Sequence, residues 1–544
     1  MAESPQRVLV RYLARGEEEK AALTGLEIDD AGRRVAAGLV AAGLAGARAL
    51  IVMETGPDFI VALLGCLYAG TIAVPAPEPR PGASLDRLAS IALACHAAAV
   101  IVSDKVAADL HRRGVADGPL AGLRVIEVGG LVAHSPMDDC PGFAHDTSHP
   151  AIIQYTSGST GAPRGIVLDS DCLIANAAAC SRALDIGQRN DAQNLCVNWM
   201  PHYHDMGLIG KIVTPLLHGY EVVHMSPLAF VQRPARWLQA VSRYGATHSG
   251  APAFALDLCA ERVTDAVIEA LDLSTWRTVF CGAEPVFATT VDTFRRRFAR
   301  AGLDPAAVFT CYGLAETTLF AAGTRGPLPA PGYVPGPAER APCWLDDETG
   351  PTIRIVGPDG GVAPDGAEGE IWVSSPSVAK GYLADEAGTR RTFDARLDPD
   401  DGRRWLRTGD LGRVDGLRFT VTGRIKDVLI ARGVNVAAVD VERFATLGLP
   451  HLNGDAAAAF QGPDEAGAPI VLIVEARRSV ATQMDEAEVV SLARAAAFER
   501  LGVSIAEIHI VPPGTLPRTT SGKIRRAAVR ETWSPPQPAL VESP

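Results

Sequence analysis

Through the first 320 residues, short apolar runs of strand length alternate with longer segments of helical pattern. Arg34–Ala42 and Cys172–Leu184 carry apolar positions in a pattern that predicts helices. Ala49–Met53 and Ala98–Val102 are short apolar runs that favour buried strands. Alternation of this kind is typical of α/β layers with mostly parallel sheets. The pattern therefore predicts an α/β fold for this part of the chain.

The most apolar segment, Phe59–Val74, is uncharged and contains two glycines. It is shorter than the roughly 20 residues that a membrane-spanning helix needs, and it stops at Pro75. We therefore expect a buried helix over 59–69 that leads into a buried strand over 71–74. The N-terminal residues lack the apolar core of a signal peptide. We expect no integral membrane association.

The pattern changes after Gly323–Pro342, a segment rich in glycine and proline. Beyond it, short apolar runs separated by Gly, Asp and Pro turns predict strands over Thr352–Val356, Gly369–Val373 and Leu417–Thr422. The charged cluster Gly423–Asp427 then precedes a further α/β-like stretch that extends to about residue 533. This last stretch is the candidate for a separate domain.

These shifts predict two domains with a boundary at 424–427. Residues 1–424 would form a large domain of layered α/β subdomains plus a β-rich subdomain, and 425–533 a small mobile C-terminal α+β domain. The tail 534–544 carries four prolines, and we expect it to be disordered. A chain of 544 residues exceeds what a single core normally organises, which also favours more than one domain.

Charge and cysteine usage narrow the class of protein. The net charge is −12, and no basic stretch is long enough to indicate nucleic acid. Ten cysteines are scattered without a C-x-x-C pair, which argues for reduced, mostly buried thiols rather than disulfides or zinc. We therefore expect a globular cytoplasmic protein with no nucleic-acid partner.

A stretch between two predicted strands, Ala151–Tyr155 and Gly165–Leu168, interleaves hydroxyl groups with glycines and ends in a cation. Glycine lets backbone N–H groups approach an oxyanion, hydroxyls donate further hydrogen bonds, and arginine offers a charged fork for phosphate oxygens. A Walker loop would lead into a helix and carry Gly-Lys-Ser/Thr, which is missing here. The alternative is a surface turn; we favour a triphosphate cradle of a different kind. Its residues are Thr156, Ser157, Gly158, Ser159, Thr160, Gly161 and Arg164.

Three further motifs carry groups that a nucleotide site needs. Tyr312 and Glu316 follow the predicted strand Ala307–Phe309 and offer an aromatic face for adenine and a carboxylate for Mg²⁺. Glu316 could also be an ordinary acid at a helix N-terminus. Asp410, in a Gly turn, can accept both ribose hydroxyls, or it forms an Asx turn. The loop Leu516–Lys523 combines hydroxyls, glycine and lysine, or it is a solvated surface loop.

In this order and at similar spacing, the motifs resemble those of the adenylate-forming superfamily, which includes acyl-CoA synthetases, luciferases and peptide-synthetase adenylation domains. The resemblance covers nearly the whole chain. Trp199–Gly210, Cys281–Val286 and Tyr312–Phe320 look most like the fatty-acyl-AMP ligase branch. The resemblance implies ATP and Mg²⁺ as cofactors and a carboxylic acid as substrate.

The resemblance also implies roles at the nucleotide. The cradle would hold the β- and γ-phosphates, Glu316 would bind Mg²⁺, and Asp410 and Arg424 would lie at the ribose. Lys426 matches the hinge about which the small domain swings. The adenine frame would consist of Gly282, Ala283, Glu284, Tyr312 and Gly313.

At the reacting carboxylate, Lys523 matches the catalytic lysine and His204 the gate, with Arg424 nearby. Lysine, with an ordinary pKa of about 10.4, is protonated for this task without tuning. A cation that bridges the incoming carboxylate and the ribose oxygens supplies orientation and charge compensation. The role of His202, pocket lining or packing, is open. The acid pocket would include His202, Tyr203, Met206, Gly207, Gly250, Ala251, Phe254 and Leu314.

Three departures from the family pattern matter. Arg164 stands where lysine is usual, which keeps the charge. Fatty-acyl-AMP ligases resemble one another in carrying an insertion between the Tyr312–Glu316 motif and the next strand. Here only Ala321–Thr352 fills that gap. In the loop Ala431–Asp440, relatives carry polar, aromatic or proline residues at several positions. Here those positions hold the small apolar residues Val434, Val436, Ala437 and Ala438. That loop guides the pantetheine thiol in the family, so the departures bear on the second half-reaction.

We therefore expect an ATP- and Mg²⁺-dependent ligase that converts an apolar carboxylic acid, fatty or a bulky natural-product acid of secondary metabolism, to an acyl-adenylate. The product would pass to an acyl carrier protein or to CoA, with or without a partner ligase. A complete acyl-CoA synthetase is one alternative, favoured by the short 321–352 segment. A non-catalytic acyl- or nucleotide-binding homologue is the other, and Glu316, Asp410 and Lys523 argue against it.

Overall fold

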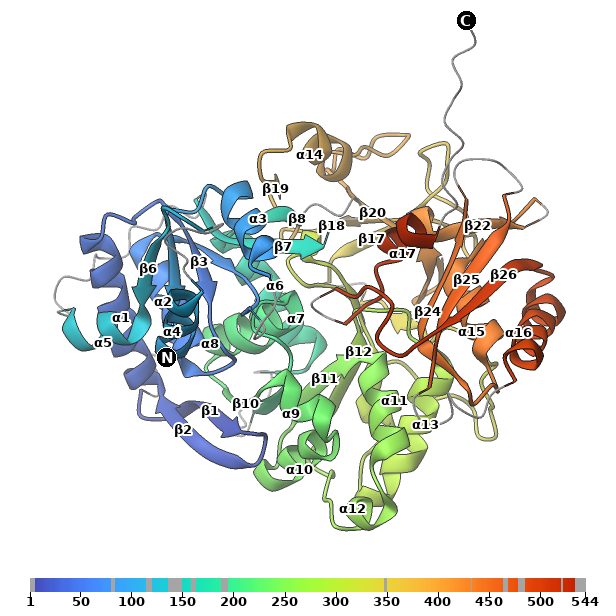
Figure 1. The fold of residues 1–544 in the computed structure, drawn as a ribbon, viewed down its shortest axis with the longest axis horizontal. Helices are drawn as coiled ribbons and strands as arrows, with labels where there is room; N and C mark the ends of the chain where they lie inside the picture. The colour runs from blue at the N-terminus through green and yellow to red at the C-terminus, as the bar shows by residue number, and fades with distance from the viewer. Residues whose placement is uncertain are drawn as a thin grey trace, which may run out of the picture.

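The fold is that of a computed structural model, which describes residues 5–79, 84–113, 120–135, 149–157, 163–186, 194–346, 350–431, 433–462, 468–477, 485–519 and 522–533. The expected disordered tail 534–544 lies outside these residues. Figure 1 shows two α/β layers, in blue and in green, with the C-terminal elements in orange and red beside them. The predicted α/β class is confirmed.

The first seven-stranded sheet has the order β19-β8-β7-β4-β3-β5-β6, and its strands from β7 to β6 are parallel. Its strands are β3 (Arg48–Val52), β4 (Ile72–Pro75), β5 (Ala99–Val102), β6 (Arg124–Glu127), β7 (Pro150–Ser157), β8 (Pro163–Asp169) and β19 (Gly381–Tyr382). Its helices are α1 (Gly25–Ala41), α2 (Pro57–Ala69), α3 (Asp86–Ala94), α4 (Asp104–Arg112) and α5 (Val128–His134). α2 and β4 confirm the helix and strand predicted within the apolar segment 59–74.

The start of α1 shows how local chemistry sets a helix boundary. The hydroxyl of Thr24 accepts a hydrogen bond from the backbone N–H of Glu27, and the Glu27 carboxylate accepts from the backbone N–H of Thr24. This capping box satisfies two N–H groups that the first helical turn cannot. Gly25 and Ile28, one turn further, are buried and direct the helix onto the sheet.

The second seven-stranded sheet has the order β13-β12-β11-β9-β10-β1-β2 and is parallel except for β2. Its strands are β1 (Val8–Ala14), β2 (Glu18–Thr24), β9 (Leu195–Asn198), β10 (Glu221–Met225), β11 (His248–Pro252), β12 (Thr278–Gly282) and β13 (Val308–Thr310). The helical elements around it are α9 (Pro227–Gln232), α10 (Ala235–Tyr244), α11 (Ala253–Arg262), α12 (Asp265–Glu269), α13 (Ala288–Phe298), η4 (Ala299–Ala301) and η5 (Pro305–Ala307).

A chain of stacked aromatic rings fills the core of this second layer. Trp199 stacks on Phe230 with ring centroids 3.9 Å apart, and Phe230 meets Trp237 edge-on at 5.8 Å. Trp237 continues to Trp276 at 5.2 Å. Offset and edge-to-face pairs of this kind add stability beyond their buried area, about 0.5–1.5 kcal/mol each. The rings fix the position of the segment that follows Trp199.

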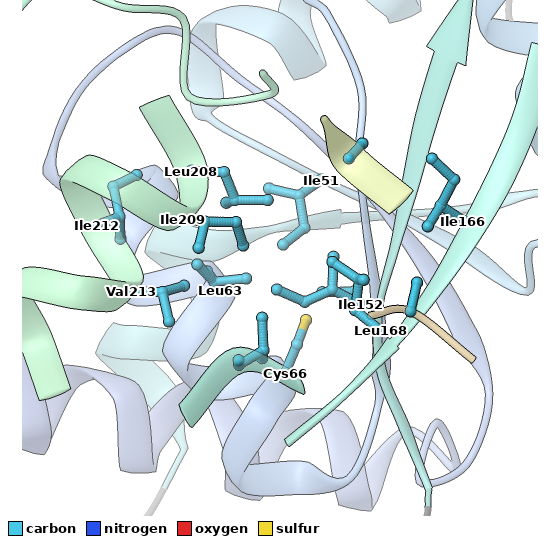
Figure 2. Close-up of a cluster of buried hydrophobic side chains, with 14 of the residues drawn as sticks. Ile51, Leu63, Cys66, Ile152, Ile166, Leu168, Leu208, Ile209, Ile212 and Val213 are labelled. Carbon is cyan, nitrogen blue, oxygen red and sulfur yellow. The ribbon is translucent and has the colours of Figure 1, made fainter. Parts of the chain in front are cut away.

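That segment forms a continuous helix between the two layers, made of α7 (Asp205–Leu208), the π-helix η3 (Ile209–Val213) and α8 (Thr214–His218). Figure 2 shows Leu208, Ile209, Ile212 and Val213 directed towards α2 and the strands of the first sheet. α6 (Ser170–Ala183) packs beside it. The helix therefore fixes the chain that leaves the His202–His204 segment.

The β-rich part contains a five-stranded antiparallel sheet of order β16-β21-β20-β18-β17. Its strands are β16 (Cys343–Trp344), β17 (Thr352–Val356), β18 (Gly369–Ser374), β20 (Leu406–Asp415) and β21 (Arg418–Arg424). Nearby are the pair β14 (Tyr312–Gly313) and β15 (Phe320–Ala322), η6 (Ala315–Thr317) and α14 (Glu386–Phe393). Three strands predicted for this region, over 352–356, 369–373 and 417–422, are confirmed.

The C-terminal part begins with η7 (Ile425–Asp427), where β21 ends. Its strands are β22 (Val428–Ala431), β23 (Val434–Ala437), β24 (Leu452–Gln461), β25 (Ile470–Ala476) and β26 (Ile505–Val511). Its helices are α15 (Ala438–Thr446), α16 (Glu486–Leu501) and α17 (Arg526–Trp533). Two core clusters draw their buried members from this part alone.

Among the helices that the structure describes, none is long and apolar enough to cross a bilayer.

Candidate active site

A cavity of about 2930 Å³ lies where the two α/β layers, the β-rich sheet and the C-terminal part meet. Its wall includes backbone and side chains from every one of these parts. The predicted site residues on this wall are Thr156, Arg164, His202, Tyr203, His204, Met206, Phe254, Ala283, Glu284, Tyr312, Gly313, Leu314, Glu316, Asp410, Arg424, Lys426 and Lys523. The fold thus brings together motifs that are hundreds of residues apart in the sequence.

Asp410 is held between a phenol and a guanidinium. The Tyr312 hydroxyl donates to one carboxylate oxygen at 2.8 Å, and Arg424 Nε donates to the other at 2.6 Å. The Asp410 charge raises the pKa of Arg424, whereas burial raises the pKa of Tyr312. A carboxylate has about four acceptor sites, so Asp410 retains acceptor capacity for a hydroxyl of a ligand.

Beside this pair, Ala283 adopts a left-handed backbone conformation with φ of +68°. A non-glycine residue in this region stores strain of about 1–3 kcal/mol and is common at functional sites. The next residue, Glu284, accepts a hydrogen bond from the backbone N–H of Phe254 at 2.7 Å. Burial raises the pKa of Glu284. The turn after β12 is therefore tied to the start of α11.

Glu316 and Arg164 both contact Tyr382. The Tyr382 hydroxyl donates to Glu316 at 3.0 Å, and the Arg164 guanidinium carbon lies 4.9 Å from the Tyr382 ring centroid. Burial raises the pKa of Glu316. Sequence reasoning missed Tyr382, because it reaches the site only through the pairing of β19 with β8, the strand that follows the phosphate cradle.

The Glu316 environment fits a hydrated Mg²⁺ better than a metal held by protein alone. Among the described residues, no group of three or more His, Cys, Asp or Glu side chains could hold a metal ion. Mg²⁺ commonly takes one or two carboxylates and completes its shell with substrate phosphates and water. One Glu316 oxygen accepts from Tyr382, which leaves the other as a hard anionic ligand.

Lys523 comes from the loop before α17. The loop is closed by a hydrogen bond from the Thr519 backbone N–H to the Lys523 carbonyl at 2.7 Å, and Gly522 takes the positive φ of +92° that the turn requires. The Lys523 side chain is accessible within the cavity, surrounded by protein. Burial lowers its pKa, and the charges of Glu284 and Asp205 oppose that shift. The sequence-based expectation of an untuned lysine is therefore replaced by one with a lowered pKa.

His204 lies at the start of the inter-layer helix. Its Nδ1 is 2.6 Å from the Asp205 carboxylate, which also accepts from the Met206 backbone N–H at 2.7 Å. Burial opposes ionisation of Asp205, but the charge and hydrogen bond of His204 outweigh it and lower the Asp205 pKa. Gln154 fixes the preceding turn by donating to the Tyr203 carbonyl at 2.7 Å.

His202 is buried against the ring of Phe59 and shares a 3.2 Å contact between its Nε2 and Nδ1 of His224. Burial lowers the pKa of His202 to about 3. Asn198 lies 3.2 Å from the same His224 nitrogen. His202 therefore both lines the cavity and packs, which answers the question that the sequence left open.

Gly207, Gly250, Ala251 and Gly282 do not line the cavity, so the first three were wrong as pocket-lining residues. A Cβ on Gly207 would lie 2.0 Å from the Pro201 carbonyl oxygen, and one on Gly250 would lie 2.4 Å from the Phe280 ring. These glycines permit close packing behind the wall. The side chain of Ser157 and all of Gly158, Ser159, Thr160 and Gly161 lie outside the described residues.

The family model of the AMP-binding enzymes matches residues 1–383 of the chain. The chain therefore belongs to the AMP-binding enzyme family, in agreement with the adenylate-forming resemblance of its motifs.

Its curated relatives are ligases of fatty acids by name. The chain is 36% identical to the putative fatty-acid–CoA ligase FadD21 of Mycobacterium tuberculosis, over 90% of this chain and 88% of the relative. It is 34% identical to the long-chain-fatty-acid–AMP ligase FadD26 of the same species, over 98% and 95%. It is also 34% identical to the medium-chain-fatty-acid acyl-carrier-protein ligase JamA of Moorena producens, over 95% and 91%.

Solved structures give the same picture. A structure from the study of fatty acyl-adenylate ligases of Escherichia coli and Legionella pneumophila is similar with a TM-score of 0.83 at 29% identity, over 96% of this chain and 94% of that one. A fatty acyl-adenylate ligase of L. pneumophila in complex with acyl adenylate and pyrophosphate has a TM-score of 0.70 at 31% identity, over 98% and 94%.

Proposed function

We propose that the protein activates a carboxylic acid with ATP, forming an acyl-adenylate and pyrophosphate. The observation that carries this proposal is the position of Lys523. This lysine, from the C-terminal part, projects into a cavity that also holds the Asp410–Arg424 pair and Glu316 of the remaining chain. Adenylation requires a cation between the bound nucleotide and the bound acid, where it stabilises the developing negative charge.

In the proposed reaction, an oxygen of the acid attacks the α-phosphorus of ATP and forms the new P–O bond. The bond from that phosphorus to the bridging oxygen breaks, and pyrophosphate leaves with the electron pair. Two anions must approach one another, so Lys523 would donate to both and compensate their charge. His204, oriented by Asp205, would face the carboxylate from the other side.

Asp410 and Arg424 would hold the ribose, and Thr156 and Arg164 would contact the phosphates. Tyr312 and the strained turn at Ala283 would frame adenine. Glu316 would hold Mg²⁺, which supplies charge neutralisation at the phosphate oxygens when bound. Tyr382 orients the Glu316 carboxylate through its 3.0 Å hydrogen bond.

The acid would be fatty, or a bulky natural-product acid of secondary metabolism. Met206, Phe254 and Trp199 supply an apolar wall near His204. FadD26 and JamA are named for long-chain and medium-chain fatty acids, which supports the same substrate class.

The acceptor would be an acyl carrier protein, with or without a partner ligase, rather than free CoA. The hairpin β22–β23 exposes Ile430 at 41% and Val434 at 62% and continues through Ala437 into α15. Among the described residues of this hairpin, Asn435 is the only polar side chain between these apolar positions, which supports a surface poorly suited to receive the pantetheine arm. The alternative, a complete acyl-CoA synthetase, rests on the short 321–352 segment. Among the residues that the structure describes, this segment holds no helix or strand between β15 and β16.

The division at 424–427 would let the small domain swing about Lys426. Arg526 binds both Asp427 and Glu442, so the hinge segment and the C-terminal core would move together. Arg340 donates to Asp440 across the division at 2.8 Å and would have to release it.

The nine described cysteines are free thiols, and all except Cys311 are buried. This supports a reducing compartment, and we propose the cytoplasm.

Acid-dependent release of pyrophosphate tests the proposal, with fatty, aromatic and terpenoid acids and with acyl-AMP and acyl-CoA followed separately. We expect acyl-AMP to form and to persist in saturating CoA. Rapid acyl-CoA formation by the protein alone would establish the synthetase alternative. Absence of pyrophosphate release with every acid would overturn the catalytic proposal and favour the binding homologue.

A further inference from the structure

Lys211 is a buried lysine in the middle of the π-helix η3, with 1% of its surface exposed. Its amine donates to the thiol of Cys196 at 3.2 Å and lies 4.2 Å from the centroid of the Phe280 ring. Among the described residues, no ion pair joins it to a carboxylate. Burying an amine with such weak partners costs several kcal/mol, so stability does not explain the residue.

The position of Lys211 follows from the helix that carries it. Ile209, Ile212 and Val213 occupy the face that packs into the first layer, as Figure 2 shows. Lys211 instead contacts Cys196 of β9 and Phe280 of β12, both in the second sheet. A π-helical turn widens the helix locally and often marks a functional site.

The cavity wall reaches the surroundings of this amine. Gly210, the residue before Lys211, lines the cavity, as do Phe280 and Cys311, whereas Lys211 itself is buried directly behind this wall. Lys211 lies six residues beyond Asp205, which places it roughly 9 Å further along the helix axis from the reacting end. The flexible stem of lysine lets its amine reach a ligand that enters beside Phe280.

Three buried histidines around this region have ring nitrogens without a partner. They are His202 at Nδ1, His224 at Nε2 and His248 at both nitrogens. Burial lowers the pKa of His248 to about 4, and its ring is therefore neutral near pH 7. Each neutral ring has one donor and one acceptor, and unpaired buried polar atoms are rare in folded proteins. Among the described residues, this amine and these three imidazoles therefore have no hydrogen bond or ion pair with a carboxylate.

We infer that the acid substrate carries a second carboxylate at its far end, and that Lys211 binds it. This inference rests on the proposed function, because it names the substrate class of the same cavity. The apolar wall near Trp199 would contact the middle of the chain, while Lys523 and Lys211 would face its two ends. A charge-assisted hydrogen bond to a carboxylate would repay the burial of the amine.

The test compares acids of equal chain length that end in a carboxylate, a hydroxyl or a methyl group. The full-length protein, Lys211→Met and Cys196→Ala are assayed by acid-dependent ATP–pyrophosphate exchange. We expect the wild type to favour the dicarboxylic acid by about 10- to 100-fold in kcat/KM, since a hydrogen bond to a charged group contributes roughly 1.5–3 kcal/mol. In Lys211→Met the preference should reverse in favour of the methyl-ended acid.

Cys196→Ala is the matched control, since it removes the thiol but keeps the amine, and it should retain the dicarboxylic preference. Lys211→Met should fold, as an apolar group replaces a buried polar one, and thermal unfolding checks this. If it does not fold, the wild-type preference still decides: a wild type that favours the methyl- or hydroxyl-ended acid overturns the inference. Exchange with methyl-ended acids alone leaves the proposed function standing, whereas no exchange with any acid removes both.

Discussion

The two ends of the cavity differ in how their charged and polar groups are satisfied. At the proposed nucleotide end, Asp410 is bound by Arg424 and Tyr312, and Glu316 by Tyr382. Behind the wall of the proposed acid end, Lys211 has only a thiol and a ring, and the neighbouring histidines keep unpaired nitrogens. The nucleotide end is preorganised without its ligand. The deep end lacks partners that a substrate would have to bring.

This difference separates groups that catalyse from groups that select. Preorganised charges reduce the reorganisation needed when the reaction occurs, and they serve any acid alike. Unpaired buried groups penalise every ligand that cannot satisfy them, which discriminates between ligands. Substitutions at the nucleotide end should therefore slow the reaction with all acids equally, and those at the deep end should change which acid is used.

The largest effect is expected at the point where the two ends meet. Lys523→Ala should lower the rate of acyl-AMP formation by about 10³-fold or more, with ATP affinity nearly unchanged, because its contact forms mainly in the transition state. Single-turnover acyl-AMP formation and ATP binding measure the two quantities. Lys20→Ala, an exposed lysine, is the control. An unchanged rate would remove Lys523 from catalysis and weaken the contrast.

The same lysine predicts a pH dependence. Burial lowers the Lys523 pKa, so the amine loses its proton at a lower pH than an exposed lysine does. The adenylation rate should therefore fall on the alkaline side before the ordinary lysine pKa of 10.5 is reached. Lys523→Arg should move this decline to higher pH, because arginine stays protonated. A pH–rate profile that is flat up to that value contradicts the prediction.

The next effect concerns stability at the deep end. Burial holds the pKa of His248 at about 4, below its ordinary value of 6.5. Between these values the unfolded chain binds a proton that the folded chain excludes, so stability is complete above pH 6.5 and falls as the pH drops towards 4. The loss is roughly 1.4 kcal/mol per pH unit for each such histidine.

Urea unfolding at a series of pH values measures this loss. His248→Gln should reduce the slope between pH 6.5 and 4, whereas His509→Gln, at an exposed histidine, should not. Equal slopes in all three proteins would show that the buried imidazoles are not the source. Neither substitution should alter the dependence of the reaction on ATP.

A smaller effect is expected at Asp410. Asp410→Asn weakens the Arg424 ion pair and would weaken the proposed ribose contact. It should raise KM for ATP by about 10-fold or more, since a hydrogen bond to a charged group contributes roughly 1.5–3 kcal/mol. The wild type should use 2′-deoxy-ATP poorly, and the variant should discriminate less between the two nucleotides. Asp415→Asn, a few residues along the same strand, is the control. Equal use of both nucleotides by the wild type argues against a ribose role.

The smallest effect is expected at Glu316. Glu316→Gln removes a hard anionic ligand while keeping the side-chain shape that Tyr382 contacts. The Mg²⁺ concentration that gives half-maximal activity should therefore rise several-fold. Titration of activity against Mg²⁺ at fixed ATP checks it. Tyr382→Phe should shift the Mg²⁺ requirement less, because it loosens the carboxylate without removing it. An unchanged Mg²⁺ requirement in Glu316→Gln would indicate that the phosphates alone hold the metal.

Much of the fold was predictable because its signals are local. The apolar run in 59–74 marks α2 and β4, and the strands of the β-rich part follow apolar runs between turns. The side chains of Asp410, Glu316 and Lys523 were predictable as a set, since each sits in a motif with its own chemistry. All three line one cavity.

The rest depends on tertiary structure. Tyr382 belongs to a two-residue strand, and its sequence does not indicate pairing with β8. Lys211 follows an apolar stretch, and only the π-helix and the packing of both layers show that its amine is buried. Gly207 was expected in the pocket, but the Pro201 carbonyl occupies the space in front of it. Burial and pairing across distant elements are the properties that local pattern leaves open.

The aromatic chain behind the acid pocket gives the protein an optical property. Trp199 touches the cavity, while Trp237 and Trp276 lie fully buried behind it, 6.1 and then 5.2 Å from ring to ring. Rings this close exchange excitation energy. Light absorbed deep in the second layer can therefore be emitted, or quenched, at the pocket wall. Intrinsic fluorescence should report entry of an acid without any attached label.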